Sequence, residues 1–78
     1  MPQHAALYAD MCDRVYAHMG PALERLTRQA LCEQGADESQ AATLSGVALY
    51  GILMMARTGK ITMEQVGQAV RGLLAQAA

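Results

Sequence analysis

The longest uncharged stretch of the chain spans residues 39–56, and most of its side chains are apolar. On a helix that turns by about 100° per residue, these side chains almost encircle the axis and leave a thin polar stripe. Asp37 precedes the stretch as an N-cap, with Gln40 at capping-box spacing, and Gly59 follows it as a C-terminal signal. The pattern predicts a nearly all-apolar helix over residues 38–58, which other segments of the chain bury.

Two amphipathic segments precede this stretch and are separated by a Gly-Pro pair. Residues 3–19 carry one apolar face at helical spacing, and residues 21–34 carry a second. Gly20 suits the position just past the end of a helix, and Pro21 suits the first position of a new one. The pair therefore predicts a boundary between two helices, and Gly35 predicts the end of the second.

The last segment has the strongest helix start in the chain. Thr62 and Gln65 have the spacing of a capping box, and Ile61 and Val66 have that of a hydrophobic staple. An apolar face then continues to the end of the segment. We therefore predict one all-α domain over residues 1–78. It is a small four-helix bundle-like fold, with helices at about 3–19, 21–34, 38–58 and 63–77 and the third helix at its centre.

The composition indicates more apolar surface than a small monomer can bury. Hydrophobic residues make up 53% of the 78 residues and charged residues 17%, whereas soluble domains carry about 25% charged residues. Short chains also bury a smaller fraction of their surface than long ones. We therefore expect a homo-oligomer, most simply a homodimer. The partner or subunit interface is expected at Leu49, Tyr50, Leu53, Leu7 and Tyr16.

The uncharged stretch also has the minimum length of a membrane span. About 18 apolar residues can cross a bilayer, but Gln40, Thr43 and Ser45 weaken the match. The other apolar faces each need a partner, which a buried central helix provides. The first residues lack the basic and apolar regions of a signal peptide. The sequence therefore argues against a membrane protein and predicts a cytoplasmic one with reduced thiols.

The sequence has no pattern typical of a metal, cofactor or catalytic site. The candidate ligands lack the paired short spacings of zinc sites, and no glycine-rich phosphate-binding motif occurs. Cys12 and His18 would point about 120° apart on one helix, so they cannot form a nucleophile–base pair. We therefore predict no enzymatic activity, no cofactor and no metal. The metal candidates considered are His4, His18, Cys12, Cys32, Asp10 and Asp13.

Cys32 is a candidate reactive thiol. On the helical wheel it lies on the face of Arg25 and Arg28, whose charges favour a thiolate. The C-terminal end of the helix dipole opposes ionisation at the same place. The alternative is a structural residue at a helix–helix or subunit contact, and the sequence leaves both interpretations open.

These observations favour a non-enzymatic protein–protein interaction module. It would be a small helical regulator, inhibitor or secretion-type chaperone that acts as a homo-oligomer and binds a protein partner. The alternative is a small helix-turn-helix transcriptional regulator that uses the third and fourth helices, joined by a short Gly-containing turn. The net charge of −1 and the scattered basic residues argue against nucleic acid as a partner. The last helix offers few groups for base contacts: Glu64, Gln65, Gln68 and Arg71.

Overall fold

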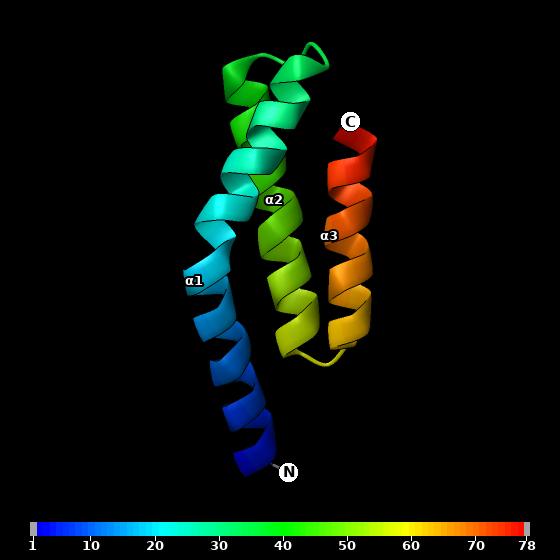
Figure 1. The fold of residues 1–78 in the computed structure, drawn as a ribbon. Coiled ribbons are helices and arrows are strands. Elements are labelled where there is room, and N and C mark those ends of the chain that lie inside the picture. Colours follow the sequence, from blue (N-terminus) through cyan, green and yellow to red (C-terminus); the bar gives the residue numbers. More distant parts are fainter. Residues whose placement is uncertain (1, 78) are drawn as a thin grey trace.

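The computed structural model describes residues 2–77, which form three helices and, within that range, no strand. They are α1 (Pro2–Glu33), α2 (Glu38–Arg57) and α3 (Met63–Ala77). Each helix reverses the direction of the one before it, and α1 is much the longest (Figure 1). All three helices contact one another, in a molecule that measures 45 × 19 × 16 Å. The predicted all-α fold is confirmed, but the predicted four-helix bundle is wrong.

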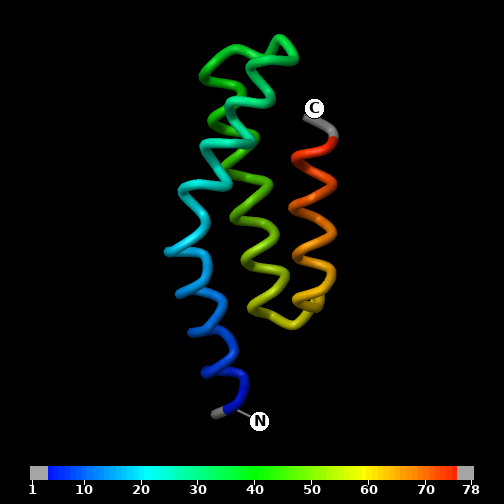
Figure 2. The backbone as a smooth tube through the Cα atoms, viewed as in Figure 1, coloured from blue at the N-terminus to red at the C-terminus, as the bar shows by residue number. Residues whose placement is uncertain are grey.

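The predicted boundary at Gly20 and Pro21 does not exist. α1 continues through Pro21 as one helix of 32 residues, in place of the two helices predicted at 3–19 and 21–34. Gly20 keeps a negative φ, so it does not act as a helix terminator. The ribbon of α1 instead changes direction near its middle, as expected where a proline removes one backbone hydrogen bond (Figures 1 and 2).

Packing against α2 explains why α1 is not broken. Buried residues of α1 lie on both sides of the proline, with Cys12 before it and Thr27 after it. Thr27 donates its hydroxyl hydrogen to the carbonyl oxygen of Leu23, at 2.8 Å, so its buried oxygen is satisfied within the helix. A continuous helix lets both halves of α1 bury apolar surface. That burial offsets the roughly 3 kcal/mol that a proline costs inside a helix.

The turn between α1 and α2 follows the sequence signals. Gly35 has a φ of +105°, a conformation that residues with a Cβ rarely adopt. Asp37 is the N-cap of α2, and its Oδ1 accepts a hydrogen bond from the backbone N–H of Gln40 at 2.8 Å. The predicted start of this helix is therefore confirmed, and its end at Arg57 lies within one residue of the prediction.

The connection between α2 and α3 also agrees with the signals predicted from the sequence. Gly59 has a φ of +76° just past the end of α2. At the start of α3, the N–H of Thr62 donates to Oε1 of Gln65 at 2.8 Å. The N–H of Gln65 donates in return to Oγ1 of Thr62 at 3.1 Å. Both halves of the predicted capping box are therefore present.

Only one side of α2 is buried. Its buried residues are spaced so that they form a single stripe, and small side chains dominate that stripe. The prediction that other segments surround this helix is therefore wrong, because two neighbours cannot cover an all-apolar cylinder. Most of its remaining apolar side chains stay at least partly exposed. The buried residues are Ala41, Ser45, Leu49 and Ala56.

α2 is also, among the helices of residues 2–77, the one whose length and composition would allow it to cross a membrane. Its best window has a mean hydropathy of 1.3. A helix at the core of a water-soluble protein has the same length and composition. α2 has a polar cap at Asp37 and a stripe buried against α1, while 22% of its apolar window is buried inside the structure.

An ion pair joins the N-terminal half of α1 to the last turn of α2. Nε of Arg57 donates to Oδ1 of Asp13 at 3.0 Å, and Nη2 donates to Oδ2 at 3.1 Å. These hydrogen bonds, with the negative charge of Asp13, raise the pKa of Arg57 above its ordinary value. The bidentate geometry fixes how the two helices are aligned, although both side chains are partly exposed.

Replacing Ser45 by Ala is expected to stabilise the protein by about 1 kcal/mol. Ser45 is 0% exposed on the stripe buried against α1, and among the described residues its hydroxyl oxygen has no hydrogen-bond partner. A buried polar group without a partner costs about 1–3 kcal/mol, and Ala is also the better helix former. Urea unfolding followed by circular dichroism measures the change. The exposed Ser39 provides the matched control, since Ser39→Ala should move the free energy of unfolding by less than about 0.5 kcal/mol.

Candidate functional site

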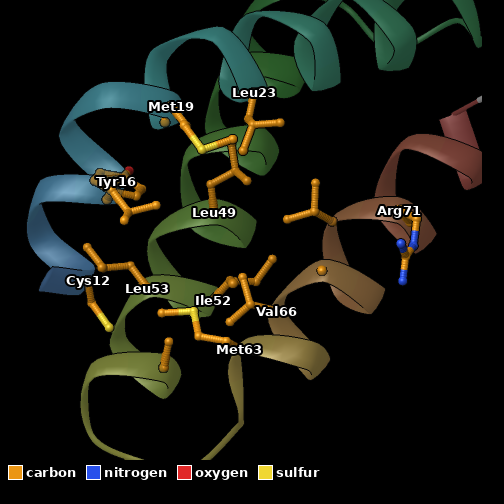
Figure 3. Close-up of a pocket in the computed structure, with 15 residues that line it drawn as sticks. Cys12, Tyr16, Met19, Leu23, Leu49, Ile52, Leu53, Met63, Val66 and Arg71 are labelled. Carbon is orange, nitrogen blue, oxygen red and sulfur yellow. The ribbon is translucent and has the colours of Figure 1, made fainter. Parts of the chain in front are cut away.

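An apolar groove of about 340 Å³ lies where the three helices meet. α1 contributes one wall, α2 the floor and α3 the other wall (Figure 3). The side chains from the three helices point toward one another across it, and the groove is open to solvent. The residues that line it are Cys12, Val15, Tyr16, Met19, Gly20, Leu23, Leu49, Ile52, Leu53, Ala56, Met63, Val66, Gly67, Val70 and Arg71.

The floor of the groove is fixed, whereas its edge can adapt. Leu49 is only 4% exposed and belongs to the buried stripe of α2. Met19 of α1 and Met63 of α3 also line the groove, and both are substantially exposed. Methionine side chains are flexible and polarizable, and proteins use them where a surface must fit differently shaped partners. The groove therefore combines a rigid base with an edge that can adjust to an apolar ligand.

Arg71 is the one charged residue that lines the groove. It extends from α3, and its guanidinium stands apart from the apolar side chains around Tyr16 and Leu53 (Figure 3). Arg71 therefore provides a positive charge at the edge and leaves the base of the groove apolar. A ligand that is mainly apolar and carries a carboxylate at one end would match this distribution.

Gly67 leaves room on the α3 wall. A Cβ built on Gly67 would meet no atom within 4 Å, so the glycine is not required for close packing of the helices. Gly72, one and a half turns later on α3, has the same open surroundings but does not line the groove. The absence of a side chain at Gly67 thus leaves space in the groove that a bulky side chain at this position would occupy.

The thiol that lines the groove belongs to Cys12. Cys12 is buried on the α1 wall, and its titratable neighbours among the described residues include Tyr8 and Arg57. Burial raises the pKa of the Tyr8 hydroxyl above its ordinary value of 10.0, and Cys12 raises it further through charge repulsion and a side-chain hydrogen bond. Tyr8 therefore stays protonated at neutral pH and cannot act as a general base. Within residues 2–77, no three His, Cys, Asp or Glu side chains come together as metal ligands would.

The five predicted interface residues do not share one surface. Leu49, Leu53 and Tyr16 line the groove. Tyr50 lies outside it and is exposed, with its ring edge-to-face against Tyr16 at a centroid separation of 6.5 Å. Leu7 is 64% exposed in the first turns of α1, which extend past the loop between α2 and α3 (Figure 2).

The sequence prediction missed the contribution of α3 to the groove. Val66 and Val70 lie on the apolar face that the helical spacing identifies, so the face itself was recognisable. Where α3 lies relative to α1 depends on packing and is not visible in the spacing. Cys32, the candidate reactive thiol, is half-buried near the end of α1 and lies outside the groove.

The helix-turn-helix alternative gains no support from the arrangement of the last two helices. α2 and α3 lie side by side and run in opposite directions (Figure 1), whereas the helices of that motif cross at about 90–120°. DNA binding, which the sequence analysis gave as the less favoured alternative, remains untested. No protein family, no curated protein and no solved structure matches the chain, so its function has to be argued from the groove.

Proposed function

We propose that the protein is a non-enzymatic protein–protein interaction module whose groove binds the apolar face of a helix from another protein. The observation that supports this proposal is the open apolar groove formed jointly by α1, α2 and α3. Helices bind such grooves through side chains at positions i, i+3 or i+4 and i+7. Small helical regulators, inhibitors and secretion-type chaperones would all use a surface of this kind.

The chemistry of the groove favours a protein segment over a small-molecule ligand. Its volume lies at the low end of the range of about 300–1,000 Å³ found for ligand pockets. Such pockets usually carry several polar groups that orient the ligand, whereas this groove has Arg71 alone at its edge as a charged group. A helix that binds through a row of leucine-like side chains needs no such polar groups, because its backbone N–H and C=O groups are already hydrogen-bonded within the helix.

Arg71 adds a preference for charge. A partner helix with a glutamate beside its apolar residues could pair with this guanidinium at the edge of the groove. Because the pair would be solvent-exposed, we expect it to set the orientation of the helix more than its affinity. The partner is therefore expected to be an amphipathic helix with an acidic residue next to its apolar stripe.

The test uses a fluorescent helical peptide with leucines at i, i+4 and i+7 and one adjacent glutamate. Fluorescence polarisation should show saturable binding to the native protein. Gly67→Leu should weaken binding at least tenfold, because the new side chain fills the groove. Gly72→Leu is the matched control and should bind like the native protein, since Gly72 does not line the groove. Both variants replace glycine by a better helix former, so loss of folding cannot explain a difference between them.

The charge preference is tested separately. Arg71→Glu should bind a peptide with lysine in place of the glutamate better than the acidic peptide, reversing the preference of the native protein. Equal binding by the Gly67→Leu and Gly72→Leu variants would contradict the proposal, as would a native protein that binds neither peptide.

A further inference from the structure

The side of α2 that faces away from its buried stripe forms a second apolar surface. We call it the outer seam, and it consists of Gln40, Leu44, Val47, Gly51, Met54 and Thr58. None of these residues is buried, and none lines the groove. Val47, at 67%, is the most exposed large hydrophobic residue in the described part of the chain. The outer seam is therefore separate from the surface used in the proposed function.

The spacing of the outer seam is that of a coiled coil. Its members follow one another at alternating intervals of four and three residues. This is the spacing of the a and d positions, which face a partner helix in a coiled coil. On a helix of 3.6 residues per turn, the outer seam lies opposite the buried stripe. Three of the outer seam's six positions, Leu44, Val47 and Met54, carry large apolar side chains, and each of these stays at least partly exposed among the described residues.

We propose that the outer seam binds the outer seam of a second copy of the chain, with the two α2 helices antiparallel, to form a homodimer. In antiparallel pairing, a positions lie opposite d positions. One register achieves this along the whole seam. It places Val47 of one copy against Gly51 of the other, and Leu44 against Met54.

In this register the exposed side chain of Val47 from one copy packs against the backbone of the other copy at Gly51, where no side chain stands in its way. A Cβ on Gly51 would meet no atom within 4 Å, so the backbone there is accessible from outside. Val47 projects from the same surface one turn earlier. In the proposed register each copy supplies one Val47 and one Gly51. The contact between Val47 of one copy and Gly51 of the other therefore forms twice, as two-fold symmetry requires. The polar residues Gln40 and Thr58 meet at the two ends.

The charges at the ends of α2 select the antiparallel orientation. The N-terminal end carries Asp37 and Glu38, whereas the C-terminal end carries Lys60 and Arg57, the latter already paired with Asp13 of α1. No charged residue lies between Glu38 and Arg57. Antiparallel helices place the acidic end of one copy beside the basic end of the other. The dipoles of the two helices then point in opposite directions, which is the favourable arrangement. A parallel pair would place like charges together at both ends.

The exposed area of the chain is larger than that of a typical monomer by the amount that a dimer interface buries. A folded monomer of 8.3 kDa is expected to expose roughly 4,600 Å². This chain exposes 5402 Å². The difference of about 800 Å² equals the area that each partner buries in a standard-sized interface. This surplus belongs to the whole surface of the chain, of which the outer seam is one part, and pairing of two outer seams would reduce it.

Sedimentation equilibrium of the native chain is expected to show a dimer. Val47→Glu should raise the dimer dissociation constant by about 100-fold, because each interface would bury two carboxylates without partners. Ser39→Glu adds the same charge to an exposed position on α2 outside the seam and should leave the dimer intact. Gly51→Leu is a second, uncharged variant, which should weaken the dimer by filling the open space while improving the helix. Circular dichroism confirms that each variant is folded.

Disulfide formation tests the orientation. The variant Leu44→Cys, Met54→Cys, in a Cys32→Ser background, should give a covalent dimer on oxidation, because these positions lie opposite each other in the antiparallel register. Leu44→Cys alone should not, since the two copies of position 44 would be ten residues, or about 15 Å, apart along the axis. A covalent dimer from Leu44→Cys alone would overturn the antiparallel arrangement.

Three results would overturn the dimer itself. The first is a native chain that remains monomeric at about 100 µM, and the second is a dimer that Val47→Glu leaves unchanged. The third is a monomer that floats with vesicles of phosphatidylcholine and phosphatidylglycerol in a manner that depends on Val47, because a lipid surface would then cover the seam. Binding of the groove peptide is measured on the same variants. It should survive Val47→Glu, so failure of the dimer and failure of the proposed function can be told apart.

Discussion

Replacing Leu49 by Ala is expected to lower the free energy of unfolding by about 2–5 kcal/mol. Leu49 is 4% exposed, lies in the stripe of α2 that packs on α1, and forms part of the floor of the groove. Its truncation removes apolar contacts from two neighbouring helices and leaves a cavity that a rigid helix pair cannot close. Because small domains have only about 0.05–0.15 kcal/mol of stability per residue, this loss is a large fraction of the total.

Thermal unfolding followed by circular dichroism measures the effect of Leu49→Ala. One kcal/mol corresponds to about 4–8 °C in a domain of this size, so Tm should fall by at least about 8 °C at equal protein concentration. Leu26 provides the control, because it is a leucine on α1 that is 48% exposed. Leu26→Ala should cost less than about 1 kcal/mol. Equal losses at the two positions would mean that α1 and α2 do not pack as described.

Replacing Pro21 by Ala is expected to raise the free energy of unfolding by about 1–3 kcal/mol. Pro21 lies inside α1, where it has no N–H to donate to the carbonyl group one turn earlier and where its ring crowds that carbonyl. Alanine restores the donor, and a proline in a helix interior is about 3 kcal/mol less favourable than alanine. Since Pro21 is exposed, the substitution removes little packing. The gain in the free energy of unfolding is smaller if α1 stays bent in the variant because it packs along α2.

Urea unfolding gives the free energy change for Pro21→Ala. Arg25, an exposed residue one turn later on α1, is the control, and Arg25→Ala should change stability by less than about 0.5 kcal/mol. A loss of stability in Pro21→Ala would show that the bend is needed to keep both halves of α1 on α2. In that case the proline would be a shaping element of the fold.

Local signals predicted the helix ends that depend on local hydrogen bonds. Asp37 caps α2 through a bond that spans three residues, and Thr62 and Gln65 cap α3 in the same way. Gly35 and Gly59 adopt positive φ angles, which would strain a residue that has a Cβ atom. Each feature involves residues close in sequence, so its energy is nearly independent of the rest of the molecule.

Pro21 shows where this reasoning fails. A Gly-Pro pair has a local preference for a helix boundary, but the preference amounts to only a few kcal/mol. Burial of Cys12 and Thr27 on the two sides of the proline outweighs it, and that burial depends on α2, which follows later in the chain. The same limit applies to the groove. The apolar face of α3 was visible in the sequence, whereas its position opposite Tyr16 and Leu53 depends on tertiary packing.

The uncharged stretch at residues 39–56 illustrates both contributions. The sequence by itself determined that it forms a capped helix with apolar side chains almost all round, because helix formation and capping depend on neighbouring residues. Only the tertiary structure decided which side is covered. Two partner helices bury the stripe at Ala41, Ser45, Leu49 and Ala56 and leave Leu44 and Val47 exposed. The reason is geometric: an apolar cylinder needs more neighbours than this short chain can supply.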